Sequence, residues 1–227
     1  MNSPQKSGAH EPTVKTLRER LVEATLQLLR DEVPTDLTVR RIATAAGTTT
    51  MAVYTCFGGR DGLLDAVYAD GFEQLRARMA PAAAVADPVQ SILALLEAYR
   101  TFALANPGLY GLLFERTLPG FDPSPDVRST ALDTTFGLLA TQAERVLNTT
   151  EQTDATRKLA YTLWALTHGL VSLELSHASR SPLAHPALGD SDAQDVLNAA
   201  LRATLTGWSE TTPQLTDRAP DTRNRPG

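Results

Sequence analysis

Hydrophobic positions along this chain recur every three or four residues, which is the spacing of one face of an α-helix. No segment alternates hydrophobic and polar positions as a strand would, and no internal repeat is visible. The pattern therefore predicts an all-α fold. The expected helices span residues 13–30, 39–46, 50–56, 61–79, 88–106, 109–115, 126–147, 154–178 and 191–208.

Two short helices are predicted on either side of a glycine within residues 37–57, LTVRRIATAAGTTTMAVYTCF. Thr38 is a good N-cap for the first helix, and Thr48 or Thr49 for the second. Gly47 lets the chain turn sharply between them, because glycine tolerates a left-handed conformation. The arrangement is that of a helix-turn-helix, although an ordinary helical hairpin has the same caps and turn.

In a helix-turn-helix the second helix enters the major groove of DNA, and its first residues reach the base edges. Thr50, Met51 and Thr55 are then the candidate base readers. Hydroxyl and guanidinium groups around them are better placed to bind phosphates, which sets the register without reading sequence. The predicted DNA-binding residues are Thr38, Arg40, Arg41, Thr48, Thr49, Thr50, Met51, Tyr54, Thr55 and Arg60.

The order Thr-Val-Arg-Arg-Ile-Ala-x-Ala-Ala-Gly-Thr-Thr-x-x-x-Val-Tyr-x-x-Phe, with Gly-Arg-Asp-Gly-Leu-Leu at residues 59–64, resembles the DNA-binding domain of the tetracycline repressor (TetR) family. The resemblance covers about residues 13–75. It implies backbone contacts by Thr38, Arg40, Thr49, Tyr54 and Arg60, and a base-facing set of Thr50, Met51 and Thr55.

The sequence departs from the family pattern where many relatives carry a basic residue at Thr50, and a histidine or arginine at Thr55. The recognition helix here is uncharged. Because cations supply much of the affinity for DNA, we expect this chain to depend more on Arg40, Arg41, Arg60 and its N-terminal arm.

The same patterns predict five regions along the chain. Residues 1–12 are a polar, disordered arm and residues 13–60 the helix-turn-helix domain. Residues 61–80 form a connector helix, and residues 81–210 a regulatory and dimerisation domain. Residues 211–227 are a disordered tail.

Leucines in the last two predicted helices recur at alternating spacings of four and three, a seam suited to pairing with another helix. We expect these helices from two chains to form a four-helix bundle. The predicted dimer interface is Leu159, Leu163, Leu166, Leu170, Leu173, Leu197, Leu201 and Leu205.

Aromatic residues with polar tips gather in the predicted regulatory domain, as in many small-molecule sites; plain core packing is the alternative. The candidate pocket residues are Tyr99, Phe102, Tyr110, Phe114, Phe136, Trp164 and His168. The run with Trp164, His168 and Gly169 also resembles the C-terminal domain of one TetR subgroup, a region where family members bind inducers and form dimers.

Charge and composition refine this interpretation. The 227 residues carry a net charge of −5, with +2 on residues 1–60 and −7 on the rest, which suits a DNA-reading head on an acidic body. The single cysteine, Cys56, excludes an internal disulfide; it is either a packing residue or a redox switch. With no signal peptide or membrane-length apolar run, we expect a cytoplasmic protein.

Catalytic and metal-binding patterns are missing from the sequence. Glu174 and His177 have half the spacing of a bundle metal site, but no second half follows. We therefore expect no metal, no cofactor and no enzymatic activity. The predicted function is a homodimeric transcriptional regulator, a repressor that leaves a near-palindromic operator when a small-molecule effector binds its C-terminal domain. The alternative is a helical small-molecule-binding or enzymatic protein that does not read DNA.

Overall fold

The computed structural model describes residues 15–30, 37–115, 118–149, 153–180 and 193–216. Every regular element in these ranges is a helix, which confirms the predicted all-α class. None of these helices is long and apolar enough to span a membrane. The elements are α1 (Leu17–Leu28), α2 (Val39–Ala45), α3 (Thr50–Phe57), α4 (Arg60–Ala83), α5 (Pro88–Ala105), α6 (Pro107–Tyr110), the π-helix η1 (Gly111–Glu115), α7 (Pro125–Val146), α8 (Asp154–Arg180) and α9 (Ala193–Thr216).

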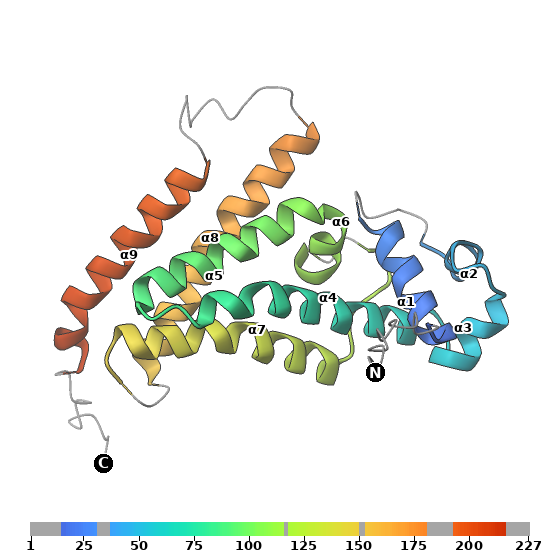
Figure 1. Ribbon diagram of the computed structural model, residues 1–227, viewed down its shortest axis with the longest axis horizontal. Helices are drawn as coiled ribbons and strands as arrows, with labels where there is room; N and C mark the ends of the chain where they lie inside the picture. Colours follow the sequence, from blue (N-terminus) through green and yellow to red (C-terminus); the bar gives the residue numbers. More distant parts are fainter. Residues whose placement is uncertain (1–14, 31–36, 116–117, 150–152, 181–192, 217–227) are drawn as a thin grey trace, which may run out of the picture.

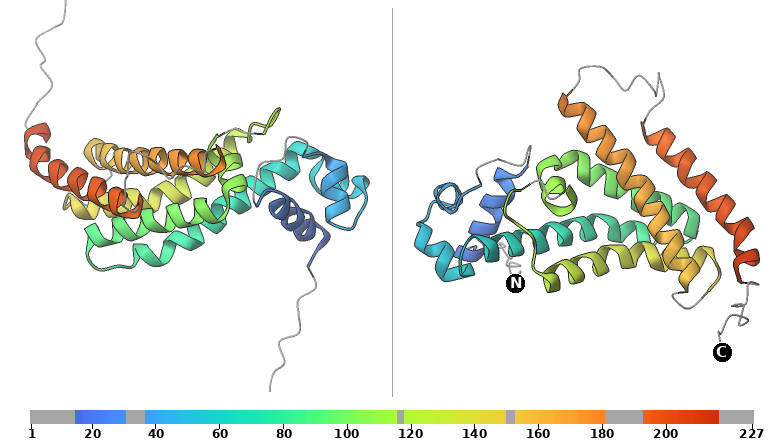
Figure 2. Two further views of the ribbon diagram at one scale, coloured as in Figure 1. Left: turned by 90° about the horizontal axis from the view of Figure 1, so that it is seen from above. Right: turned by 180° about the vertical axis from the view of Figure 1, so that it is seen from behind.

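The short helices α1, α2 and α3 gather at one end of the molecule (Figure 1). Helix α4 begins there and continues into the body, where it packs between α5 and α7. The two further views in Figure 2 show α9 at the end of the body away from the head, while α8 crosses the body beside α5. The long helix α4 is therefore the physical link between head and body.

Local sequence explains how the head helices begin and turn. Thr16 and Glu19 form a reciprocal capping box at the start of α1. The Thr38 hydroxyl accepts a hydrogen bond from the Arg41 amide at 3.3 Å, as predicted for the N-cap of α2. Gly47 has φ +61°, a left-handed conformation that other residues rarely adopt. These features place α2 and α3 at a tight turn.

One hydrophobic cluster extends from the head through α4 into the body. It includes Ile42 and Val53 of the head, Phe72 of α4 and Tyr110 of α6, all nearly inaccessible to solvent. A second cluster joins α5, α7, α8 and α9. Head and body therefore share a core, and a change in the body can reach the head through packed side chains.

Several predicted boundaries shift in the structure. Helix α4 continues through Pro81 to Ala83. Proline cannot donate a main-chain hydrogen bond, but Pro81 lies in the last turn of the helix, where few further main-chain hydrogen bonds remain to be formed. The predicted helix 109–115 is instead α6 followed by the π-helix η1. Helix α9 extends to Thr216, so residues 211–216 are helical and not disordered. The predicted N-terminal arm and residues 217–227 lie outside the described residues.

The predicted leucine seam is mostly interior. Five of its eight members have at most 3 % of their surface exposed and belong to the second hydrophobic cluster: Leu159, Leu163, Leu197, Leu201 and Leu205. Residues with no surface left in one chain cannot meet a second chain. These five leucines therefore pack α8 and α9 on α5, α7 and each other within one chain, and the dimer interface itself stays a prediction.

Candidate nucleic-acid interface and effector cavity

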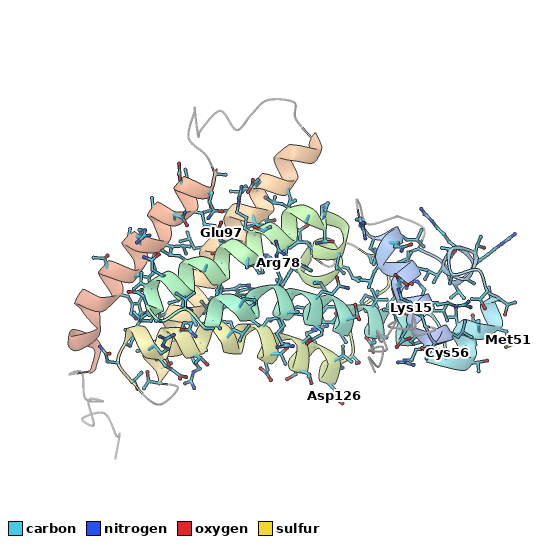
Figure 3. The ribbon with its side chains drawn as sticks, viewed as in Figure 1. Lys15, Met51, Cys56, Arg78, Glu97 and Asp126 are labelled. Carbon is cyan, nitrogen blue, oxygen red and sulfur yellow. The ribbon has the colours of Figure 1, made fainter. Side chains whose placement is uncertain are left out.

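The outer face of α3 carries the predicted base readers. Met51 and Tyr54 are 68 % and 55 % exposed, and Thr50 and Thr55 are exposed beside them. Figure 3 shows Met51 at the end of the molecule farthest from α9. The opposite face of α3 buries Val53 completely. Helix α3 is thus held by its inner face, while its outer face is open to a partner.

Hydroxyl groups on this face have different hydrogen bonds available. The Thr55 hydroxyl donates to the Met51 carbonyl at 3.0 Å, so it can offer DNA only its methyl group and its lone pairs. The Thr38 hydroxyl accepts from a backbone amide and keeps its proton for a phosphate oxygen. Thr55 is therefore suited to a thymine methyl or a base donor, and Thr38 to the backbone.

The remaining predicted contacts surround α3. Arg40 and Arg41 are exposed on α2, and Thr49 is exposed at the N-cap of α3; Thr48 is half-buried. With Thr38, these residues form a polar rim beside the uncharged recognition helix. The structure thus brings nine of the ten predicted residues to the surface on and around α2 and α3.

Arg60 is the tenth, and its guanidinium is used inside the protein. Its Nε donates to the Leu37 carbonyl at 3.1 Å, and one terminal nitrogen lies 3.5 Å from the Pro119 carbonyl. The side chain is only 28 % exposed. Arg60 therefore joins the start of α2 to a loop of the body.

Arg18 supports the recognition helix from α1, a role that the sequence patterns did not suggest. It donates to the Cys56 carbonyl at 2.7 Å, and its guanidinium lies 4.2 Å from the centre of the Phe57 ring. A cation at the C-terminal end of a helix also meets the negative end of its dipole. Cys56 itself is half-buried against the core.

A second cluster of functional groups lies inside the body. The hydroxyls of Tyr99 and Tyr110 lie 2.9 Å and 2.8 Å from the same atom, Nδ1 of His168. Trp164 packs at a tilt against His168, with ring centres 5.5 Å apart. The cluster connects α5, α6 and α8 through polar contacts within an otherwise hydrophobic interior.

This cluster is uncharged near neutral pH. Burial raises the pKa of Tyr99 and of Tyr110 far above the usual range of a tyrosine. Burial also lowers the pKa of His168, and the nearby Glu115 carboxylate opposes this effect. A neutral imidazole can accept one strong hydrogen bond at Nδ1 or donate one there, so the two tyrosines compete for a single position.

Stability should therefore depend on pH through His168. Its pKa is lower in the folded chain than the ordinary 6.5, so the unfolded chain takes up the proton first as pH falls. This contribution is present above pH 6.5 and is lost as pH falls toward the folded-state pKa. We expect His168→Gln to reduce the loss of unfolding free energy between about pH 7.5 and about pH 5.5. Urea titrations of both proteins at both pH values measure it, and an equal loss in both would contradict it.

Next to the cluster is a cavity of about 240 Å³ between α4, α5, α7 and α8. Four of the seven predicted pocket residues line it: Tyr99, Phe114, Phe136 and Trp164. Tyr110 and His168 are not in the lining; they lie behind Tyr99, whose hydroxyl meets Nδ1 of His168. Phe102 is not part of the lining; it is buried in the shared core, because α5 turns it toward α4.

The cavity wall includes residues that the sequence patterns assigned elsewhere. Leu75 and Met79 come from the α4 stripe, and Asp133 and Tyr161 lie one turn before Phe136 and Trp164. Asp133 and Tyr161 could have been identified from the sequence, because each lies three residues before a predicted pocket residue and therefore on the same side of its helix. Glu174, one of the two residues with the spacing of a bundle metal site, accepts two hydrogen bonds from Arg100, at 2.9 Å and 2.6 Å, and the described residues contain no group of three side chains that could hold a metal ion. The His177 side chain lies outside the described residues.

Comparison with known proteins agrees with this arrangement of a head and a body. The profile of "Bacterial regulatory proteins, tetR family" matches residues 21–67, and that of "Tetracyclin repressor-like, C-terminal domain" matches residues 92–204. The chain is 29 % identical over 122 residues to the HTH-type transcriptional regulators Mb1846 of Mycobacterium bovis and Rv1816 of Mycobacterium tuberculosis. The match spans about half of this chain and 52 % of each of these relatives.

Solved structures share the fold. A Rhodococcus sp. RHA1 protein of unknown function superposes with a TM-score of 0.68, at 23 % identity over 88 % of this chain and 98 % of that chain. The TetR family transcriptional regulator PfmR of Thermus thermophilus gives 0.58, at 18 % identity over 82 % and 97 %. A tetR-family transcriptional regulator of Streptomyces coelicolor gives 0.62, at 19 % identity over 89 % and 87 %. With a helix-turn-helix at residues 21–67 and a repressor-like body at residues 92–204, the chain carries both domains of the tetR family.

Proposed function

We propose that this chain is a cytoplasmic, sequence-specific DNA-binding transcriptional regulator. The observation that carries the proposal is the outer face of α3, where the large, mainly hydrophobic side chains of Met51 and Tyr54 are mostly exposed to solvent. Two large side chains one turn apart on the outer face of a firmly held helix form a surface that a partner can cover. The matched tetR N-terminal domain supports the major groove of DNA as that surface.

The regulator acts as a homodimer, and its interface uses the exposed side of α8 and α9 and not the five buried leucines of the predicted seam. Ala165 and Gly169 lie one turn apart on the exposed side of α8, and Leu173, the exposed member of the predicted seam, follows one turn later. On α9 the exposed small residues include Ala199, Ala203 and Gly207. Small residues allow helices from two chains to approach closely in a four-helix bundle. A two-fold axis through this bundle presents two heads to the two half-sites of a near-palindrome.

The chain is a repressor whose operator affinity falls when a small molecule occupies the body cavity. By thermodynamic linkage, a ligand that prefers one placement of the heads changes DNA affinity by the same factor that DNA changes ligand affinity. Phe114 and the Tyr99–Tyr110–His168 cluster connect the cavity wall to α6 and η1. The subgroup marked by Trp164, His168 and Gly169 stays a prediction for this body.

Two contacts carry a displacement of η1 to the head. Gly71 of α4 lies so close to η1 and α6 that an added Cβ would meet Leu109 at 3.0 Å and Leu113 at 3.1 Å. After η1, the chain returns to the start of α4, where the Ser124 amide donates to Asp65 at 3.1 Å and Arg60 reaches Pro119. A ligand that shifts η1 must therefore move α4 or the loop that Arg60 holds.

Arg60 should position α2 and not bind a phosphate. We expect Arg60→Lys and Arg60→Met to weaken operator binding by similar factors, roughly threefold to tenfold, because neither can reproduce the hydrogen bonds to Leu37 and Pro119. The salt dependence of binding should stay as in the parent protein, since no phosphate contact is lost. Fluorescence anisotropy at several salt concentrations measures both quantities. A near-normal Lys variant, or a slope reduced by about two in the Met variant, one for each protomer of the dimer, would show a phosphate contact instead.

Selection of binding sites from random duplex DNA with the purified full chain tests the proposed function. Recovery of a two-fold symmetric motif, with half-sites one helical turn or a multiple apart, is the expected result. Repeating the selection at raised salt separates base-specific binding from general attraction to phosphates. Failure to enrich any motif would contradict a sequence-specific regulator and favour a small-molecule-binding protein.

A further inference from the structure

The body cavity has an unusual combination of lining groups. Five of its twelve lining residues are aromatic, and most of the others are aliphatic: Leu75, Met79, Leu96, Tyr99, Phe114, Leu132, Asp133, Thr135, Phe136, Leu139, Tyr161 and Trp164. Its volume of about 240 Å³ lies just below the roughly 300–1,000 Å³ of drug-sized sites, so its ligand must be compact. Asp133 is the sole charged residue in this lining.

Most polar groups of the wall already have partners. The Thr135 hydroxyl donates to the Ala131 carbonyl at 3.2 Å, and the Tyr99 hydroxyl lies 2.9 Å from Nδ1 of His168. Asp133 differs, because within the described part of the chain it accepts only a long hydrogen bond of 3.5 Å from Ser129. No lysine or arginine of the described residues forms an ion pair with it. The carboxylate is therefore the polar group of the wall with the most capacity to bind a ligand.

The electrostatics of the surroundings favour positive charge. The Glu115 carboxylate lies close enough to affect the pKa values of Tyr99, Tyr110 and His168. His168 is neutral near pH 7, because burial lowers its pKa. Aromatic faces carry negative partial charge, and those of Tyr161 and Trp164 meet edge to face with ring centres 5.8 Å apart. The carboxylates and the ring faces thus both attract a cation, whereas the lining contains no positively charged side chain that could bind an anion.

We propose that the cavity binds a compact hydrophobic cation, such as a protonated arylalkylamine or a quaternary ammonium compound. Its apolar part fills the space between Leu75, Leu96 and Phe136, and its charged group lies between Asp133 and the rings of Tyr161 and Trp164. This inference rests on the proposed function in that the cation is the effector of the regulator, but the binding itself can be measured without DNA.

The test compares three probes of similar shape and different charge on the full chain. They are phenyltrimethylammonium, its neutral isostere tert-butylbenzene, and the anion 4-tert-butylbenzoate. Quenching of tryptophan fluorescence reports binding, since Trp164 lines the cavity. We expect the cation to bind about tenfold more tightly than the neutral isostere, the gain expected from desolvated cation–π contacts, and the anion not to bind.

Three variants assign the preference to the cavity. Asp133→Asn should weaken binding of phenyltrimethylammonium by about threefold to fivefold and leave tert-butylbenzene unchanged, as expected for an exposed charge pair. Tyr161→Leu should also lower the preference for the cation, and the fold should stay intact because the Tyr161 ring is exposed. The control is Asp126→Asn, which removes an exposed carboxylate near the start of α7, outside the lining (Figure 3), and should change nothing.

Equal affinity for cation and neutral isostere, tighter binding of the anion, or no binding of any probe would overturn the proposed ligand class. These outcomes are separate from the DNA selection. If a motif is recovered but the cation is not preferred, the proposed regulator stands and the proposed ligand class is wrong. If the cation binds but no motif is recovered, the proposed cation site stands and the proposed regulator is wrong.

Discussion

Replacing Tyr54 by alanine should weaken binding to the selected operator by at least about tenfold while the dimer stays intact. Tyr54 is 55 % exposed on α3, and its ring lies beside Gly59, so its hydroxyl is free to point toward DNA. A hydrogen bond to a charged group contributes roughly 1.5–3 kcal/mol, and the dimer makes the contact twice. Anisotropy titration of labelled operator gives the affinity, and sedimentation gives the oligomeric state.

Tyr54→Phe is the matched control, because it removes the hydroxyl alone. If Tyr54 donates to a phosphate, the phenylalanine variant should resemble the alanine variant in affinity. If the ring packs on a sugar or base instead, phenylalanine should bind almost normally. Unchanged affinity in both variants would show that α3 does not face DNA as proposed. Thermal unfolding of both proteins should be near that of the parent, since Tyr54 has little buried surface to lose.

Leu163→Ala should lower the unfolding free energy by about 2–5 kcal/mol, the usual cost of truncating a buried leucine. Leu163 is fully buried in the cluster of α5, α7, α8 and α9, so the lost contacts belong to one chain. Gly169→Arg, two turns away on the exposed side of α8, should leave that stability unchanged or slightly raised, because no atom lies within 4 Å of an added Cβ and arginine favours helix over glycine. The arginine should nevertheless dissociate the dimer.

Sedimentation and urea unfolding together distinguish the two faces of α8. A monomeric but stable Gly169→Arg protein, with weakened operator binding, places the dimer interface on the small-residue face. A fully dimeric Gly169→Arg protein would reject that face. A Leu163→Ala protein that is as stable as the parent but monomeric would return the interface to the leucine seam. Unfolding must be compared at one protein concentration, because dimerisation itself adds stability.

The sequence by itself determined α2 and α3 of the head to within one residue, whereas α1 begins at Leu17, four residues after its predicted start. Caps and turns act over neighbouring residues, so Thr38 and Gly47 could be assigned without knowing what packs around them. Helical periodicity likewise predicted the helices of the body, because residues on the apolar face of a helix recur every three or four positions in the sequence. The residues exposed on α3 followed from the same local geometry.

Periodicity shows that a helix has an apolar face but not which partner covers it, and there the tertiary structure decided. The spacing of the leucines in α8 and α9 is compatible with a seam between two chains and with a core within one chain. In the folded chain, most of them lie in the core formed with α5 and α7. Arg60 was interpreted as a phosphate contact, but long-range packing brings the carbonyls of Leu37 and Pro119 within its reach. The cavity depends on the distances between four helices, so Asp133 and Tyr161 became part of a site only when those helices were placed together.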